Sequence, residues 1–340
     1  MERLAVIGAG SWGTTIAHLL AEKGCAIDLW VYEPELADII REKRENTYFL
    51  KGFKLSENIF PSSSIEKVVS AKNILVMVVP SQLYRSVAEK MVPFLKTDAV
   101  LVSATKGIEN DTLLTMTGVW QEIVTGPKKL EVATLGGPSF AREVMQKIPT
   151  AVTVASSYPS LARKIQKIFS TSYFRVYTST DKIGVELGGA LKNVIALAAG
   201  ITDGLGFGYN TRAALITRGL AETIRLGVKI GAQPLTFAGL SGIGDLILTC
   251  TGDLSRNRTV GLKLGQGQNL GEILKSMKMV AEGVATTKSV YNLAKKMEVE
   301  MPICSSVYSI LFEKKKPIEA LHELMDRELK AEVSENFTPI

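Results

Sequence analysis

A glycine-rich turn near the start of the chain constrains the fold more than any other feature. Residues 4–7 form a short apolar run, Gly8-Ala9-Gly10-Ser11-Trp12-Gly13 follows, and residues 14–23 have a helical pattern. In such a strand–turn–helix unit the first glycine permits the tight turn, and the second lets the backbone approach a pyrophosphate. The third lets the helix pack close to the strand, and the helix N-terminus then faces the anion. The motif in this context predicts a dinucleotide-binding cradle.

A second strand-like run and an acid at its end fit the same cradle. Residues 26–31 are mostly apolar, and Glu33 lies twenty residues after Gly13. At that position a carboxylate accepts hydrogen bonds from the adenosine ribose. The alternative is a plain turn followed by a surface acid. Because the motif, the strand and the acid have the spacing of one strand–helix–strand unit, nucleotide binding is the favoured interpretation.

Strand-like and helix-like runs alternate through the first half of the chain. This alternation predicts a parallel, doubly wound sheet, extended by two later strands with some antiparallel pairing. The further strand-like runs are residues 73–79, 99–104, 131–135, 151–155 and 175–178. From about Asp181 the pattern is helical, most clearly at 181–202 and 210–230. We therefore expect an α/β fold, with a Rossmann-like domain in residues 1–180 and an all-α domain in residues 181–340.

Ligands of such sheets bind at the carboxyl ends of the strands, so residues that directly follow strands are candidates for binding. Lys106 follows one strand-like run and could hold an anionic substrate or polarise a carbonyl. The alternative is a solvated lysine in a turn. Gly137 and Ser139 follow the next run and could donate backbone and hydroxyl hydrogens to substrate, or could simply begin a helix.

One lysine stands alone in an apolar helix. Lys192 is the only ionisable side chain in residues 187–202, and Gly188, Ala196 and Ala199 share its helix face. Its ammonium group either extends to solvent or points into a cleft. In a cleft, desolvation lowers the pKa of the lysine, which can then act as a general acid and base.

A polar cluster later in the chain suits an anion. Ser255 fits the N-cap of a helix, and backbone donors there, with the guanidinium of Arg256 and the amide of Asn257, would suit a phosphate. The alternative is a capped surface helix with exposed basic residues. Asp245 is better explained as the partner of a buried cation than as an isolated acid.

Composition argues against several other classes of protein. With 46% hydrophobic and 22% charged residues the chain is an ordinary globular protein. It has no signal-peptide pattern and no apolar run of about 18 residues, so we expect a cytoplasmic protein without membrane contact. The net charge of +6 is spread along the chain, which suits small anionic ligands better than nucleic acid. Three scattered cysteines suit neither a disulfide framework nor a closed zinc site, and two histidines leave few candidates for histidine-based acid–base chemistry.

Several motifs in this sequence occur together in one known family. They are GAGSWG at 8–13, ATKG at 104–107, GGPS at 136–139, ELGGALKNV at 186–194, DGLGFG at 203–208, GDL at 244–246, LSRNR at 254–258 and EG at 282–283. With them the chain resembles bacterial NAD(P)-dependent glycerol-3-phosphate dehydrogenase over essentially its full length. The resemblance implies reversible hydride transfer between NAD(P)H and dihydroxyacetone phosphate, giving sn-glycerol 3-phosphate for phospholipid synthesis. It also implies a homodimer.

The resemblance implies roles for individual residues. Lys192 would be the proton donor and acceptor, and Lys106 and Arg256 would contact both ligands. The cofactor would lie along Gly8, Gly10, Ser11, Trp12, Gly13, Tyr32, Glu33, Lys106, Ala141, Arg256, Val280 and Glu282. The substrate would lie against Lys106, Gly137, Ser139, Lys192, Asp245, Thr249, Ser255, Arg256 and Asn257.

Two other functions compete with this one. A related dehydrogenase of a hydroxy acid would share the glycine-rich turn and the helical lysine, but its substrate would carry a carboxylate. The Ser255-Arg256-Asn257 cluster favours a phosphate instead. A non-catalytic dinucleotide sensor would need no lysine in an apolar helix, so Lys192 and Asp245 favour an enzyme.

The preference between NAD and NADP depends on Glu33. Its carboxylate accepts hydrogen bonds from a ribose 2′-OH but repels the 2′-phosphate of NADP, and no arginine stands at position 32 or 33. We predict a preference for NAD, with solvent screening leaving some use of NADP. Glu33→Arg should shift the ratio of kcat/KM values toward NADP, more strongly at low ionic strength. A wild-type preference of about tenfold for NADPH, unchanged in the variant, would show that other residues read the ribose.

Overall fold

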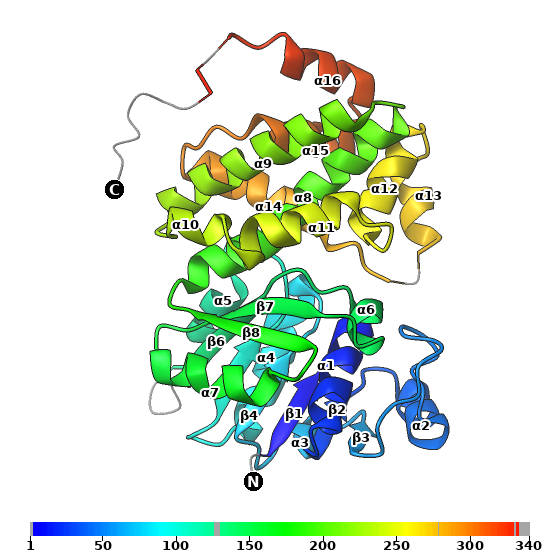
Figure 1. Cartoon of the computed structure of the whole chain (residues 1–340), viewed down its shortest axis with the longest axis vertical. Helices are drawn as coiled ribbons and strands as arrows, with labels where there is room; N and C mark the ends of the chain where they lie inside the picture. The colour runs from blue at the N-terminus through cyan, green and yellow to red at the C-terminus, as the bar shows by residue number, and fades with distance from the viewer. Residues whose placement is uncertain (1–2, 126–129, 278, 330, 333–340) are drawn as a thin grey trace.

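An eight-stranded sheet with helices on both faces makes up one half of the molecule, and helices alone make up the other (Figure 1). The computed structural model describes residues 3–125, 130–277, 279–329 and 331–332. The expected fold class, a Rossmann-like, mostly parallel sheet followed by an all-α part, is confirmed. The strands are β1 (Leu4–Ile7), β2 (Ile27–Trp30), β3 (Ile59–Ser62), β4 (Ile74–Met77), β5 (Val100–Ser103), β6 (Glu131–Gly136), β7 (Thr150–Ala155) and β8 (Phe174–Ser179).

The strand order places a ligand site next to the glycine-rich turn. Across the sheet the order is β3-β2-β1-β4-β5-β6-β7-β8. The pairs from β3 to β6 are parallel, whereas β6 pairs with β7 antiparallel, so the last two strands run the opposite way. The chain order reverses between β1 and β4, and doubly wound sheets bind ligands at such a switch point. The glycine-rich turn directly follows β1 and therefore lies there.

One strand was not predicted from the sequence. β3 pairs only with β2 and forms the edge of the sheet. Its third residue, Pro61, has no backbone N–H and interrupts any strand-like pattern. An edge strand tolerates proline because one side of the strand needs no partner.

Helices cover both faces of the sheet, so its central strands are buried on both sides. All four residues of β1, β4 and β5 are buried, which explains their continuous apolar sequences. One face packs against α1, α2 and α7, and the other against α3, α4 and α5. The helical elements of this half are α1 (Ser11–Glu22), α2 (Pro34–Lys43), α3 (Ile65–Val69), η1 (Ser81–Leu83), α4 (Tyr84–Met91), η2 (Val92–Phe94), α5 (Met116–Ile123), α6 (Ala141–Met145) and α7 (Pro159–Phe169).

The second half is built around one long buried helix, α8 (Lys182–Gly204). Asp181 caps it by accepting a hydrogen bond from the backbone N–H of Gly184 at 2.9 Å. Its neighbours in space are α9, α11, α12, α14 and α15, which surround it in Figure 1. The other helical elements are α9 (Tyr209–Lys229), α10 (Pro234–Phe237), η4 (Leu240–Gly244), α11 (Asp245–Thr251), α12 (Arg256–Gly265), α13 (Leu270–Lys275), α14 (Glu282–Lys296), α15 (Pro302–Phe312) and α16 (Pro317–Met325).

Glycines bring α8 and α12 into backbone contact. A Cβ built on any of four glycines would lie 2.0–2.3 Å from a carbonyl oxygen of the facing helix, far inside normal contact distance. Only glycine therefore permits the backbones of α8 and α12 to approach this closely. The close approach places the start of α12 beside the middle of α8. The four are Gly200, Gly204, Gly261 and Gly265.

Two stretches are long and apolar enough to cross a membrane, contrary to the sequence expectation. They are α8 and the stretch Pro234–Thr251, with mean hydropathies of 1.3 and 1.2. In α8, 94% of the apolar window is buried inside the protein, so its apolarity belongs to a core helix. The second stretch is 39% buried and has non-helical backbone at Gly242, which breaks it into separate helices. Length and hydropathy alone therefore identify no membrane span here.

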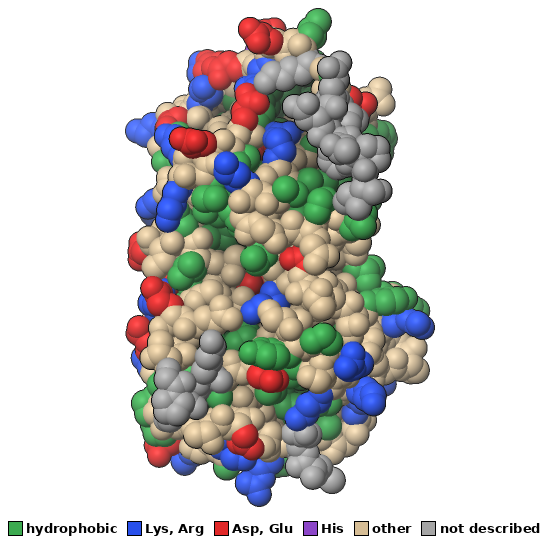
Figure 2. Space-filling view, turned by 90° about the vertical axis from the view of Figure 1, so that its left-hand side faces the viewer, with side chains coloured by type: hydrophobic (Ala, Val, Ile, Leu, Met, Phe, Trp, Pro, Cys, Tyr) green, Lys and Arg blue, Asp and Glu red, His purple; other side chains and the backbone are tan. Residues whose placement is uncertain are grey.

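Charged residues are distributed along one face of the molecule. Figure 2 shows Lys and Arg side chains from one end of a face of the molecule to the other, with Asp and Glu among them. The net charge of +6 is thus not gathered into a single stripe on this face. Such a distribution differs from the concentrated basic patch of a nucleic-acid-binding surface.

The contact between α8 and α12 predicts a size limit at Gly261. A Cβ there would lie 2.1 Å from the backbone oxygen of Leu197, so Gly261→Ala should lower the free energy of unfolding by about 2 kcal/mol or more. The control is Gly118→Ala in α5, where the nearest atom is the Leu114 Cβ at 3.4 Å. Alanine favours helix there and should be neutral or stabilising. Equal melting temperatures of the two variants would contradict this account of the helix contact.

Candidate active site

The carboxylate of Asp245 lies between two lysine side chains. Asp245 begins α11 and is fully buried. Its Oδ1 accepts a hydrogen bond from Lys192 Nζ at 2.6 Å, and its Oδ2 accepts one from Lys106 Nζ, also at 2.6 Å. One negative charge therefore holds a positive charge from each half of the chain through charge-assisted hydrogen bonds. The pairing of Asp245 with a buried cation agrees with the sequence expectation, whereas its contact with Lys106 was not predicted.

The position of Lys192 decides between the two interpretations of a lysine in an apolar helix. Lys192 lies in the middle of α8 and is 8% exposed, so its ammonium group does not extend along the helix into solvent. Its Nζ also donates to Thr249 Oγ1 at 3.0 Å. Burial lowers the pKa of Lys192 to about 7, against the opposing effect of Asp245 and with a smaller lowering by Lys106. A lysine with this pKa can donate and accept a proton near neutral pH.

Lys106 reaches Asp245 from the carboxyl end of β5. Its side chain passes over Gly189 of α8, where a Cβ would lie 3.4 Å from Lys106 Cγ. The Nζ group also donates to the backbone oxygen of Gly137 at 3.1 Å, so Lys106 is not a solvated turn lysine. The hydroxyl of Ser139 donates to the same oxygen at 3.0 Å. The loops after β5 and β6 thus converge beside the lysine–carboxylate cluster.

The start of α12 carries the residues predicted to bind phosphate. Ser255 caps the helix as expected, because its Oγ accepts a hydrogen bond from the N–H of Arg258 at 3.2 Å. Arg256 is exposed, and its Nη1 donates to the backbone oxygen of Val280 at 2.9 Å. A guanidinium has five N–H donors, so this contact leaves others for a ligand.

The amide of Asn257 is largely used inside the protein. Its Oδ1 accepts from the N–H of Gly283 at 2.9 Å, and its Nδ2 donates to Asn193 Oδ1 at 2.8 Å. Since an amide nitrogen has two hydrogens, one donor is left. Asn193 was not singled out from the sequence, although a polar residue directly after Lys192 in an apolar helix was an available signal.

The glycine-rich turn has the geometry that a pyrophosphate requires. Gly8 has φ +111°, a conformation that glycine adopts readily, and a Cβ on Gly13 would lie 1.9 Å from Gly8 O. A Cβ on Gly10 would meet no atom within 4 Å. Ser11 and Trp12 begin α1, and no side chain caps this helix start. Open space in front of an uncapped helix N-terminus fits the phosphates of NAD or NADP.

Three more of the predicted cofactor residues belong to this half of the chain. Tyr32 is 73% exposed, and Glu33 stands half-buried directly before α2. Ala141 begins α6, and the hydroxyl of Thr15 in α1 donates to its backbone oxygen at 3.4 Å. All three therefore lie on elements that follow strands of the sheet or contact α1.

A carboxylate of the helical half contacts the first residue of η1, which follows β4. Glu282 begins α14, and it accepts hydrogen bonds from the N–H of Ser81 at 3.3 Å and from the Ser81 hydroxyl. Burial raises the pKa of Glu282, whereas the bonds from Ser81 lower it. Val280, two residues earlier, is 52% exposed. Ser81 follows a strand-like run, at the edge of the sheet where ligands are expected, but its contact with Glu282 was not predicted, because the two residues lie 201 positions apart in the sequence.

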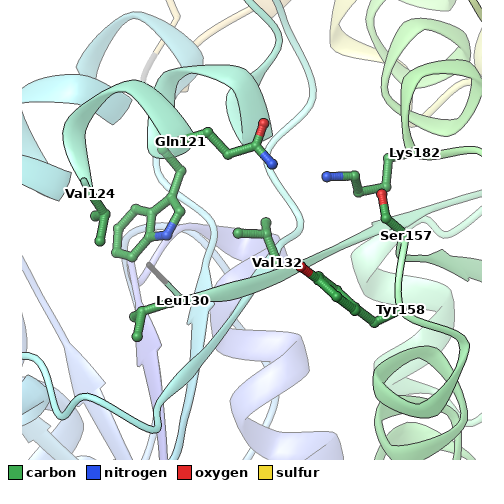
Figure 3. Close-up of a pocket in the computed structure, with 8 residues that line it drawn as sticks. Gln121, Val124, Leu130, Val132, Ser157, Tyr158 and Lys182 are labelled. Carbon is green, nitrogen blue, oxygen red and sulfur yellow. The ribbon is translucent and has the colours of Figure 1, made fainter. Parts of the chain in front are cut away.

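A separate cavity of about 120 Å³ lies where α5, the start of β6 and the first turn of α8 meet. Its lining is Trp120, Gln121, Val124, Leu130, Val132, Ser157, Tyr158 and Lys182 (Figure 3). Lys182 precedes Lys192 by ten residues on α8, about 15 Å along a helix, so the cavity is not part of the Asp245 cluster. Across the described part of the chain the three cysteines are free and no group of His, Cys, Asp and Glu could hold a metal.

A sheet with an open glycine-rich helix start, joined to a helical half through a buried lysine–carboxylate cluster, has the features of a dinucleotide-dependent dehydrogenase. Family models agree with this class. The model of the NAD-dependent glycerol-3-phosphate dehydrogenase N-terminus matches residues 3–162, and that of the C-terminus matches residues 181–322. The chain belongs to the NAD-dependent glycerol-3-phosphate dehydrogenase family.

Relatives and solved structures extend the match to nearly the whole chain. A glycerol-3-phosphate dehydrogenase (NAD(P)+) of Syntrophobacter fumaroxidans is 59% identical over 97% of this chain and 97% of its own. One from Geobacter sp. is 60% identical over 97% of this chain and 99% of its own. The crystal structure of the Coxiella burnetii glycerol-3-phosphate dehydrogenase is 37% identical, with a TM-score of 0.92 over 96% of this chain and 99% of that one. These findings confirm the expected enzyme class and its use of NAD or NADP.

Proposed function

We propose that this chain reduces dihydroxyacetone phosphate reversibly to sn-glycerol 3-phosphate and that Lys192 moves the proton. The observation that carries the proposal is the buried contact of Lys192 with Asp245, with Lys106 on the other carboxylate oxygen. A hydroxy-acid dehydrogenase or a dinucleotide sensor fits the family less well. Burial, a carboxylate partner and a lowered pKa together are typical of a catalytic acid.

Each residue of the cluster has a part in the proposed reaction. When bound, reduced NAD(P) supplies the hydride that C2 of the substrate accepts. Lys192 Nζ gives a proton to the oxygen on C2 and takes it back in the reverse direction. Asp245 and Thr249 hold Nζ in place at 2.6 and 3.0 Å. Lys106 stabilises the negative charge that develops on this oxygen as the carbonyl group is reduced.

The substrate phosphate is proposed to bind at the start of α12. Backbone N–H groups there, the Ser255 hydroxyl and the guanidinium of Arg256 supply donors. Asn257 is proposed to donate to the phosphate through its second amide N–H. This is a smaller contribution, since the other polar contacts of its side chain are inside the protein. Gly137 and Ser139, at the end of β6, are proposed to bind the other end of the substrate, next to Lys106.

The cofactor is proposed to bind over the glycine-rich turn and to contact residues of both halves of the chain. Its pyrophosphate faces Gly8, Gly10 and Gly13. The adenosine end follows Tyr32 and Glu33, and Glu33 makes NAD the preferred form. The remaining proposed contacts are with Ser11, Trp12, Lys106, Ala141, Arg256, Val280 and Glu282.

Several broader proposals accompany this function. Residues 1–180 are proposed as the dinucleotide-binding domain and residues 181–340 as the helical domain, of which residue 330 and residues 333–340 lie outside the described structure. The end of β8 at Ser179 and the start of α8 at Lys182 support this boundary. We also propose a cytoplasmic homodimer that supplies glycerol phosphate for phospholipid synthesis.

The role of Lys192 predicts a loss of turnover without loss of the cofactor. Lys192→Ala should lower kcat by about 10²- to 10⁴-fold, while the NADH dissociation constant stays near the wild-type value. The glycine-rich turn that is proposed to bind the pyrophosphate belongs to the other half of the chain. In the wild-type enzyme, reduction should slow as pH rises through about 7, because Lys192 loses the proton that it must donate. Oxidation should accelerate over the same range.

Lys182→Ala is the matched control, since Lys182 is on the same helix but lines the separate cavity. It should keep the wild-type kcat and pH profile. Near-normal kcat in Lys192→Ala would remove Lys192 from the mechanism.

The placement of the phosphate predicts a substrate-selective effect of Arg256→Ala. A charge-assisted hydrogen bond contributes roughly 1.5 to 3 kcal/mol, so kcat/KM for dihydroxyacetone phosphate should fall about ten- to hundredfold. Dihydroxyacetone has no phosphate and serves as the internal control. The variant also loses the hydrogen bond from Arg256 to Val280, but this loss affects the reactions of both substrates equally. If kcat/KM fell by the same factor for both substrates, Arg256 would not be the phosphate ligand.

A further inference from the structure

We infer that Asn46 is a positioning residue that turns the N–H group of Gly10 toward the pyrophosphate of the cofactor. This inference rests on the proposed placement of the cofactor at the glycine-rich turn. Asn46 lies in the segment between α2 and β3 and is fully buried. It belongs to none of the motifs from which the site was predicted.

The buried side chain of Asn46 forms hydrogen bonds with the glycine-rich turn and with the first turns of α1. Its Nδ2 donates to the backbone oxygen of Ala9 at 2.8 Å and to Thr14 Oγ1 at 2.8 Å. The hydroxyl of Thr14, also fully buried, donates to the same Ala9 oxygen at 3.2 Å. Asn46 Oδ1 accepts from the N–H of Phe49 at 2.9 Å, which fixes the orientation of the amide. The Ala9 carbonyl is therefore held by two donors inside the protein.

The planar peptide bond carries this constraint to Gly10. Within the described residues no peptide bond is cis, and in a trans peptide the C=O and the following N–H point in opposite directions. Because the Ala9 oxygen is turned inward to Asn46 and Thr14, the Gly10 N–H is turned outward. A Cβ on Gly10 would meet no atom within 4 Å, so the space beside it is open to a ligand. The outward N–H adds one donor to those of the α1 N-terminus.

A purely structural role for Asn46 would be to close the turn that contains Phe49. The two roles differ in which ligands they affect. If the Gly10 N–H loses its orientation, only ligands that carry a diphosphate should bind more weakly. If the turn is merely loosened, every ligand that binds to the sheet half should bind more weakly. ADP contains the diphosphate and adenosine does not, so their inhibition constants against NADH separate the two roles.

The experiment uses neutral variants of the full-length enzyme, so that no charge is added beside the anion. Asn46→Ser shortens the side chain and removes the amide donors, and Thr14→Val removes one of the two donors with almost no change of shape. Asn58→Ser is the matched control, because Asn58 donates to the backbone oxygen of Ala21 at the other end of α1. Thermal unfolding is measured alongside for every variant.

We expect Asn46→Ser to raise the inhibition constant of ADP and the KM for NADH by about ten- to hundredfold, the effect of one charge-assisted hydrogen bond. The inhibition constant of adenosine and kcat should change little. Thr14→Val should shift the ADP constant in the same direction by a smaller factor, and Asn58→Ser should not shift it. If Asn46→Ser fails to fold, the ADP-to-adenosine ratio in Thr14→Val carries the test.

Equal losses for ADP and adenosine, or an unchanged ADP constant in folded variants, would overturn the inference. Gly10→Val separates that outcome from an error in the cofactor placement. Gly10 has φ −64° and ψ 177°, which any residue adopts, so valine there should fold and block only the ligand. Normal ADP binding by Gly10→Val would show that the pyrophosphate lies elsewhere. Weak ADP binding by Gly10→Val with normal binding by the Asn46 and Thr14 variants would reject the role of Asn46 alone.

Discussion

The structure depends on the burial of one carboxylate, that of Asp245, between two lysines. A carboxylate removed from water is strongly destabilising unless partners compensate it, and here two ammonium groups stand 2.6 Å from its two oxygens. Lys106 comes from the end of a strand and Lys192 from α8, so this compensation requires the sheet and the helical half to meet in one geometry. The cluster also leaves excess positive charge where an anionic substrate is proposed to bind. The same contacts thus hold the two halves together and prepare the proposed active site.

The long helix α8 transmits this constraint to the rest of the molecule. Near its start, the buried carboxylate of Glu186 accepts hydrogen bonds from the N–H and hydroxyl of Thr117 in α5, at 2.8 and 2.6 Å. Near its end, glycines bring it into backbone contact with α12. Lys192 and Asn193 lie between these two contacts, on a part of the helix that has little freedom to shift. A rigid element is what a proton donor needs, because small displacements of a reacting group reduce its efficiency.

Much of the fold could be predicted because its signals are local. The turn at 8–13, the apolar strands and the helices from Asp181 onward are each defined by residues close together in the chain, where periodicity and glycine spacing act directly. β3 escaped prediction because Pro61 interrupts it and an edge strand needs only one partner. α8 was expected as a helix, but it is long and apolar enough to cross a membrane, and its burial among other helices is visible only in the folded structure.

The sequence by itself determined the class of fold, the dinucleotide cradle and the isolated lysine, since each depends on neighbouring residues. Only the tertiary structure decided which polar groups meet. Lys106 reaches Asp245 across 139 residues, Ser81 reaches Glu282 across 201, and no local pattern encodes such pairs. The fold also decided which donors remain for a ligand, as at Asn257, whose amide is largely used internally. Hydrogen bonds act over about 3 Å, so they depend on where the folded backbone places each group and not on its distance along the chain.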